Sequence, residues 1–254
     1  MGTAIVVTSG KGGVGKSTVS LGLAAQFAAN GERVLLVDCD AGLRSLDRMT
    51  GTEESLVFDS SDVVAGRCAP AEAIYPCAGM PGVSLLPAPQ NGEDLVPAHV
   101  MQRLVPMLKR YFDRVLLDSP AGVGRGFRAA AAAADRALIV CSPEPVCIRD
   151  AAIVRRLLLE TGVSDQRLII NRFQAAYFRQ LSAEAADQER QGFCRDLDDV
   201  IDRSGVRLIG VVPEDKILSA AFAHGRLPGA NAPGFMALSR IAARLNGVPV
   251  PLAI

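Results

Sequence analysis

A glycine-rich loop near the start of the chain contains two lysines. Residues 8–20 read TSGKGGVGKSTVS, and the pattern G-x-x-x-x-G-K-[ST] runs from Gly10 to Ser17. In such a loop the backbone N–H groups curl around phosphate oxygens, while Lys16 neutralises phosphate charge and Ser17 offers its hydroxyl to Mg²⁺. The pattern requires only one lysine, so the role of Lys11 needs a separate explanation.

The loop and the start of the helix behind it form the first candidate site. A positive helix end and successive N–H groups favour a polyphosphate ligand. A glycine-rich turn without a ligand is the weaker alternative, because strand, loop and helix follow in the order that a phosphate site requires. The predicted phosphate-binding residues are Gly12, Gly13, Val14, Gly15, Lys16, Ser17 and Thr18.

Acidic residues stand at the ends of two apolar runs. RVLLD ends at Asp118, where a carboxylate can hold a water on Mg²⁺, and RVLLVD ends at Asp38, with Asp40 two residues later. We predict Ser17, Asp38 and Asp118 around the metal ion and Asp40 beside the attacking water. Aspartates that only cap turns are the alternative. Cys39, between two carboxylates, should have a raised thiol pKa and is not expected to act as a nucleophile.

These residues need strands and helices to bring them together. Near-continuous apolar strands alternating with helices predict an α/β fold, a doubly wound, mostly parallel sheet with helices on both faces, of the P-loop NTPase type. The helix at 16–30 should bury one face. The expected strands are 3–9, 33–38, 83–88, 114–118, 136–142, 167–171 and 206–213.

Composition limits the classes of function. The chain has 254 residues, 27 basic and 27 acidic, so no nucleic-acid partner is expected. Six scattered cysteines form no C-x-x-C pair, which indicates reduced thiols. No apolar run has the ~20 residues that span a bilayer. We predict a single P-loop ATPase domain over 1–254, with an exposed helical insertion at 174–203.

Several motifs together resemble the MinD branch of the MinD/ParA ATPases, which have a deviant Walker A loop. The motifs are KGGVGKST, DCDAGLRSLD, LLDSPAG, SPEPVCIRD and IGVVPED, and the resemblance covers residues 3 to about 250. In that family the early lysine reaches across an ATP-bound homodimer to the partner's nucleotide. The resemblance therefore implies that Lys11 is catalytic in trans, together with Lys16 and Asp40.

The resemblance also implies cofactors, partners and a place in the cell. It indicates a slow, Mg²⁺-dependent ATP hydrolase, activated by dimerisation, that acts in septum placement with division-inhibitor and activator proteins. It places the protein in the cytoplasm and leaves open its recruitment to the inner face of the cell membrane. By resemblance, the residues beside the base are Asn171, Arg172, Pro213, Glu214 and Asp215.

The sequence departs from the family at several positions. Ser45 stands where the family commonly has asparagine, and ARLNGVPVPLAI at the end contains no recognised membrane-anchoring helix. The main alternative is therefore a ParA-like or other cargo-positioning ATPase that acts without direct membrane binding. A metabolic enzyme of the same fold and an ATP-binding scaffold that barely hydrolyses ATP are further alternatives. Among metabolic enzymes of this fold, one that resembles the nitrogenase iron protein is disfavoured, because the stretch DSPAGVG contains no cysteine to bind an iron–sulfur cluster.

Overall fold

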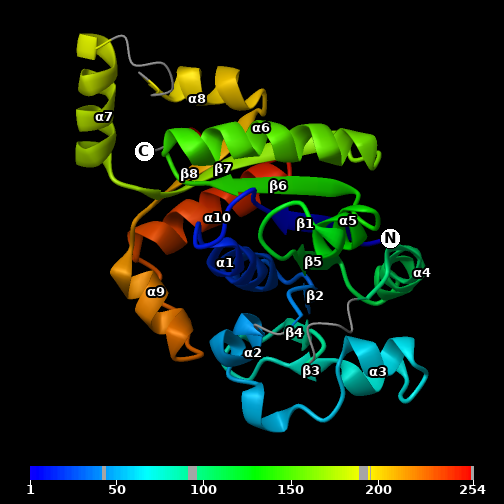
Figure 1. Ribbon diagram of the computed structural model, residues 1–254. Coiled ribbons are helices and arrows are strands. Elements are labelled where there is room, and N and C mark those ends of the chain that lie inside the picture. The colour runs from blue at the N-terminus through cyan, green and yellow to red at the C-terminus, as the bar shows by residue number, and fades with distance from the viewer. Residues whose placement is uncertain (42–43, 91–95, 189–193, 195, 253–254) are drawn as a thin grey trace.

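One sheet of eight strands organises the part of the chain that the structure describes. The computed structural model describes residues 1–41, 44–90, 96–188, 194 and 196–252. The strand order is β3-β4-β2-β5-β1-β6-β7-β8 (Figure 1). The strands are β1 (Thr3–Thr8), β2 (Val34–Asp38), β3 (Tyr75–Pro76), β4 (Val83–Leu86), β5 (Arg114–Asp118), β6 (Arg136–Cys141), β7 (Asp165–Phe173) and β8 (Leu208–Pro213).

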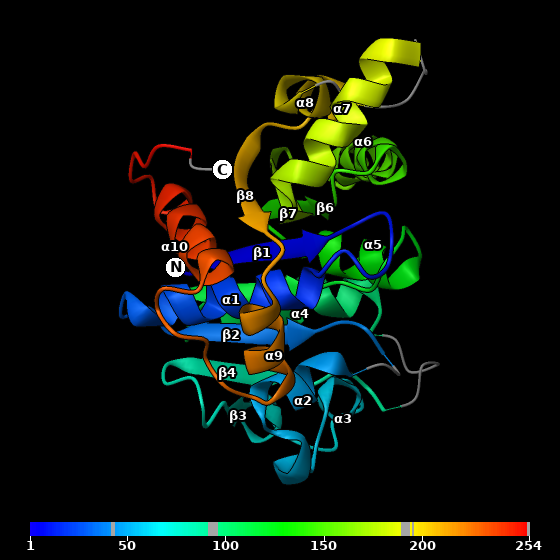
Figure 2. The ribbon, with the colours of Figure 1, turned by 90° about the vertical axis from the view of Figure 1, so that its left-hand side faces the viewer.

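The predicted mostly parallel sheet is confirmed. All neighbouring strands run parallel except β3, which pairs antiparallel with β4. The sequence did not indicate β3, since a two-residue strand has no periodicity. Parallel register places the ends of β2 and β5 side by side, with Asp38 opposite Asp118. Figure 2 shows the arrowheads of β1 and β2 pointing to the same edge of the sheet. We call this the carboxyl edge, and the opposite one the amino edge.

Helices cover both faces of the sheet, as predicted. Figure 2 shows α1, α9 and α10 in front of the sheet and α4 and α5 behind it. In Figure 1, α6 lies above β6, and α8 packs on the outside of α6. Short 3₁₀ helices lie at Glu53–Ser55 and Pro70–Ala73. The α-helices are α1 (Lys16–Ala29), α2 (Ser45–Thr50), α3 (Ser60–Val64), α4 (Ala98–Leu108), α5 (Arg125–Ala131), α6 (Pro145–Glu160), α7 (Ala175–Gln188), α8 (Leu197–Ser204), α9 (Lys216–Ala223) and α10 (Pro233–Leu245).

Helix α1 is buried more deeply than the sequence indicated. Val19, Leu23 and Phe27 are fully buried, as expected for one apolar face. Leu21 and Ala24, on other sides of the helix, are also fully buried. The reason is that α1 packs between the sheet and α10, so solvent reaches little of its surface. This packing fixes the position of the loop that precedes α1.

The 174–203 segment contains α7 and all of α8 except its last residue, and the expectation of exposed helices needs correction for α8. Val200 is fully buried and Cys194 is buried, because α8 packs against α6. The apolar residues of α8 recur at i and i+3, but acidic residues surround them. The sequence therefore did not indicate a buried helix face here. Residues 189–193 and 195 of this segment lie outside the described residues.

The last described residues fold back onto the amino edge. Arg244 Nε donates to the carbonyl oxygen of Val250 at 2.9 Å. The predicted absence of an anchoring helix also concerns residues 253–254, which lie outside the described residues. Within the described ranges, no helix is both long enough and apolar enough to cross a bilayer.

Candidate functional site

The glycine-rich loop joins β1 to α1 at the carboxyl edge. Gly13 and Gly15 adopt left-handed φ angles of 78° and 89°, which side chains rarely tolerate. A Cβ on Gly15 would also lie 2.3 Å from Nδ2 of Asn171. Lys16 begins α1 and is only 9% exposed. The glycines at 13 and 15 therefore allow a loop conformation that residues with side chains would rarely adopt.

Asp118 lies beneath this loop at the end of β5. Ser17 Oγ donates to its Oδ2 at 2.7 Å, and Ser20 Oγ donates to its Oδ1 at 2.8 Å. Asp118 is 2% exposed, and burial raises its pKa to about 6, although both hydroxyls favour the carboxylate. The sequence analysis missed Ser20. Its position, three residues after Ser17 on the same face of α1, was the available signal.

Asp38 forms a second buried carboxyl group beside Asp118. It is 1% exposed, and burial followed by repulsion from Asp118 holds its pKa well above the ordinary range. Oδ1 accepts from the N–H of Asp40 at 2.9 Å, whereas Oδ2 is buried without a hydrogen-bond partner in the described structure. Adjacent carboxylates with an unpaired oxygen, next to a serine hydroxyl, suit a hard cation such as Mg²⁺. The residues present thus fit the predicted metal.

Asp40 is half-buried, in contrast to its neighbour Asp38. Burial raises its pKa, and the positive charge of Lys16 opposes that shift. The electrostatic influence of Lys16 therefore reaches Asp40, as expected if both face one ligand. The structure brings Asp40 to the same edge as Ser17 and Asp118.

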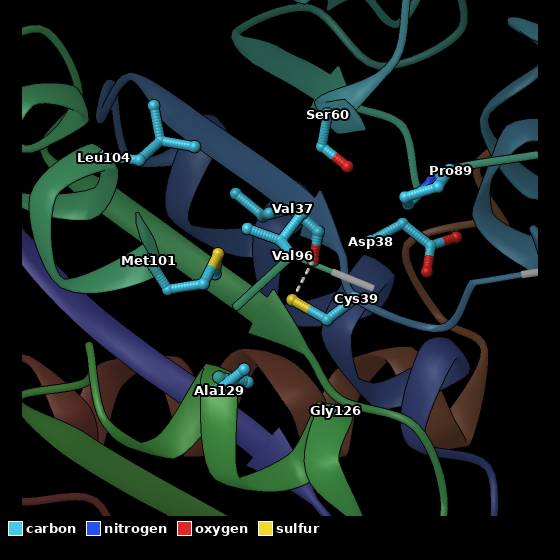
Figure 3. Close-up of a pocket in the computed structure, with 11 residues that line it drawn as sticks. Val37, Asp38, Cys39, Ser60, Pro89, Val96, Met101, Leu104, Gly126 and Ala129 are labelled. Carbon is cyan, nitrogen blue, oxygen red and sulfur yellow. Dashed lines mark hydrogen bonds between the residues drawn. The ribbon is translucent and has the colours of Figure 1, made fainter. Parts of the chain in front are cut away.

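Cys39 points away from this group of carboxylates. Figure 3 shows its sulfur directed at the carbonyl oxygen of Val37, 3.7 Å away, beside Met101 and Val96. These residues line a small, mainly apolar space of about 20 Å³. The thiol pKa is raised well above its ordinary value, as predicted, but burial contributes more than the neighbouring carboxylates.

Lys11 is exposed at the rim of the loop. Its Nζ lies 3.5 Å from Oε2 of Glu144, and the two side chains are 52% and 46% exposed. Glu144 directly precedes α6 and was not singled out from the sequence, although it lies within the SPEPVCIRD motif. An open hollow of about 270 Å³ beside the pair is lined by Lys11, Gly12, Gly13, Val14, Ser142, Pro143, Glu144, Cys147, Arg172, Gln174, Tyr177 and Glu214.

Asn171 and Arg172 support the loop from the end of β7. Asn171 Nδ2 donates to the carbonyl oxygen of Val14 at 2.8 Å. Arg172 Nη1 donates to the carbonyl oxygen of Gly13 at 3.1 Å, and Arg172 Nε donates to Glu214 Oε2 at 2.8 Å. Arg172 has a φ of 57°, an uncommon conformation for a residue with a side chain. These contacts join the predicted base-side residues to the predicted phosphate-side residues.

Pro213 and Asp215 lie on either side of Glu214. Pro213 ends β8, half-buried. Asp215 caps α9, because Oδ1 accepts from the N–H of Ile217 and of Leu218, and Oδ2 accepts from that of Gly234. Both carboxylate oxygens of Asp215 are thus already engaged in holding α9 and the start of α10.

The DCDAGLRSLD motif ends on α2. Ser45 begins this helix, and its Oγ lies 3.4 Å from Oγ of Ser17. Residue 45 therefore contacts the proposed metal ligand directly. Gly42 and Leu43 of the same motif lie outside the described residues.

Comparisons with known proteins give consistent results. Residues 5–228 match the model of the CobQ/CobB/MinD/ParA nucleotide binding domain. The chain is 38% identical to the septum site-determining protein MinD of Synechocystis sp. over 256 residues, which is 99% of this chain and 92% of that protein.

Solved structures show the same similarity. A chain of a MinC:MinD cell division protein complex from Aquifex aeolicus has a TM-score of 0.86 at 33% identity, covering 99% of this chain and 98% of that one. The septum site-determining protein MinD of Pyrococcus horikoshii, complexed with Mg-ADP, has a TM-score of 0.82 at 25% identity, covering 97% and 96%.

Proposed function

Because this chain belongs to the CobQ/CobB/MinD/ParA nucleotide-binding family, we propose that it acts as a MinD-like ATPase, an ATP-dependent dimerisation switch in placement of the division septum. The support is full-length similarity to septum site-determining proteins, which favours this function over a ParA-like one. Similarity to a chain solved in a MinC:MinD complex supports recruitment of a division inhibitor. An activator protein and recruitment to the inner face of the membrane belong to the same proposal.

The single observation that carries the proposal is the set of contacts around Asp118. Ser17 and Ser20 bind the two oxygens of this buried carboxylate, while Asp38 lies opposite it across β2 and β5. Ser17, Asp38 and Asp118 would hold Mg²⁺. When bound, Mg²⁺ neutralises charge that builds up on the phosphates during transfer.

The other residues of the loop bind and orient the substrate. The N–H groups of 12–18 hold the phosphates of ATP, and Lys16 balances their charge from the start of α1. The half-buried carboxylate of Asp40 accepts a hydrogen bond from the attacking water and orients it. Asn171, Arg172, Pro213, Glu214 and Asp215 form or support the wall beside the base.

Lys11 makes the reaction depend on a second copy of the chain. In one copy it pairs with Glu144 at 3.5 Å, and both side chains are about half exposed. Exposed ion pairs contribute little to stability, so this contact exchanges readily for a stronger one. A phosphate group on the partner's nucleotide offers more negative charge, and a cation supplied there stabilises the transition state. Hydrolysis is therefore slow in the monomer.

The test compares molecular mass with nucleotide state by light scattering. The wild type should dimerise with Mg-ATP and remain monomeric with Mg-ADP. Lys16→Ala should weaken ATP binding by about 100-fold, because it removes a charge-assisted contact to phosphate. Lys11→Ala should bind ATP normally but fail to dimerise. Arg33→Gln, which removes one positive charge from the amino edge, is the matched control. Dimers that persist in both lysine variants would contradict the switch.

A further inference from the structure

Five strands have an arginine at or near their amino end. Arg33 and Arg207 directly precede β2 and β8, Arg114 and Arg136 are the first residues of β5 and β6, and Arg167 is the third residue of β7. Because these strands are parallel, all five arginines lie along the amino edge. A chain with no net charge thus has a basic edge opposite the acidic strand ends of the carboxyl edge.

Part of this row borders an open hollow at the amino edge. Its volume is about 420 Å³, larger than the 270 Å³ hollow beside Lys11. Volumes of about 300–1,000 Å³ are typical of small-molecule sites. Four arginines line it from three strands and one helix, and Asp165 and Asn246 lie between them. The arginines are Arg114, Arg136, Arg167 and Arg244.

Positive charge exceeds negative charge around the hollow. Asp165 bridges two arginines, with Oδ2 at 2.7 Å from Arg136 Nε and Oδ1 at 2.7 Å from Arg167 Nη1. Arg114 is balanced by Glu32. Among the described residues, Arg244 has no carboxylate within ion-pair distance. Among the described side chains around the hollow, three guanidinium groups therefore share one carboxylate, an excess of two positive charges.

Backbone contacts hold these guanidinium groups in place. Arg244 donates to the carbonyl oxygens of Ile209 and Val250 at 2.7 and 2.9 Å, and Arg136 donates to that of Leu245 at 3.2 Å. Burial, and then the nearby charge of Arg240, lower the pKa of Arg244. An anion in the hollow would relieve this repulsion, and positions fixed in advance reduce the entropic cost of binding it.

We propose that the hollow at the amino edge binds a phosphate-bearing anion. Guanidinium groups bind phosphate through paired hydrogen bonds, and Arg136 and Arg167 are 38% and 34% exposed, so their remaining N–H groups can reach a ligand. The anion is either free in solution or part of a lipid headgroup. Strands of five or six residues separate the hollow from the glycine-rich loop by roughly 20 Å, so the two sites can be filled together.

The first experiment titrates sodium pyrophosphate into the full chain by calorimetry. Because pyrophosphate can also enter the glycine-rich loop, the informative protein is Lys16→Ala, which should retain one pyrophosphate site. Adding Arg167→Gln to Lys16→Ala should weaken that site about tenfold or more, as expected for a lost charge-assisted contact. Adding Arg33→Gln instead, the same charge change outside the hollow, should leave binding unchanged.

A second measurement does not depend on the folding of any variant. In the wild type, hydrogen exchange of residues 136–138 and 244–247 should slow when pyrophosphate is added. Absence of both this protection and a pyrophosphate site in Lys16→Ala would overturn the proposal. Equal weakening by Arg33→Gln and Arg167→Gln would also overturn it, because a diffuse field, not the hollow, would then hold the anion.

Vesicles distinguish the two sources of the phosphate. The chain is sedimented with vesicles of phosphatidylglycerol and phosphatidylcholine, and with phosphatidylcholine alone. Pelleting only with phosphatidylglycerol, reversed by pyrophosphate and reduced by Arg167→Gln, assigns the hollow to a lipid headgroup. Pyrophosphate binding without pelleting assigns it to a free anion. Either result supports a phosphate site in the hollow.

Discussion

The carboxyl edge of this sheet buries charged side chains, whereas the amino edge leaves them partly exposed. At the carboxyl edge, Asp38 and Asp118 are 1% and 2% exposed, and one oxygen of Asp38 has no hydrogen-bond partner in the described structure. At the amino edge, Arg136 and Arg167 are more than a third exposed and share a carboxylate. Buried carboxylates oppose folding, whereas solvated ion pairs have little effect on it. The difference indicates that charge burial lowers stability at the carboxyl edge, where we propose that Mg²⁺ and nucleotide bind, but not at the amino edge.

The largest effect on stability is expected from a glycine at the carboxyl edge. Gly15→Ala should lower the free energy of unfolding by roughly 4 kcal/mol, since it adds left-handed strain to a clash with Asn171. Gly31→Ala is the matched control, with a similar φ of 85° but no atom near the new Cβ. Gly31→Ala should lower the free energy of unfolding only by the left-handed strain, about 1–2 kcal/mol. Urea unfolding measures both, and equal losses would refute the role of Asn171 contact.

Asp118→Asn should stabilise the protein in the absence of nucleotide and Mg²⁺. Burial raises the pKa of Asp118 from 3.8 to about 6, so between these values the folded state binds more protons than the unfolded state. Stability of the wild type therefore falls as pH rises through that window. The variant lacks this loss, so its advantage should be small at pH 4 and reach up to about 3 kcal/mol at pH 8.

Urea unfolding at several pH values, with a chelator present, measures this advantage. Ser20→Ala is a useful companion, because it removes one hydroxyl that binds the carboxylate and should lower stability at pH 8. An advantage of Asp118→Asn that is the same at pH 4 and pH 8 would show that the carboxylate is not strained by burial. Asp118→Asn should also abolish the effect of Mg²⁺ on nucleotide affinity.

The smallest effect is expected at the amino edge. Arg33 pairs with Asp113 at 3.0 Å, and both side chains are well exposed. Arg33→Gln should leave the urea midpoint unchanged, because water and salt screen such a pair. A clear drop in the urea midpoint would mean that ion pairs stabilise the amino edge. The two edges would then differ only in the sign of the charge that they carry.

Much of the candidate site follows from local sequence. The glycine loop, Lys16 and Ser17 stand in a fixed order before a helix, and apolar runs ending in Asp38 and Asp118 predict strands of a parallel sheet. The packing of α8 against α6 was harder to predict from the sequence, because charged residues surround the apolar positions of α8. Ser20 and Glu144 were missed because their importance lies in which residues they touch, and those partners are 98 and 133 positions away.

The sequence by itself determined the fold class and was enough to predict residues for phosphate and metal binding, because periodicity and loop spacing act over short stretches of chain. Only the tertiary structure decided which charges are buried and which are shared. Parallel register places Asp38 against Asp118 and collects the arginines of separate strands at one hollow. Burial and charge balance depend on residues that are distant in the chain, so no local pattern specifies them.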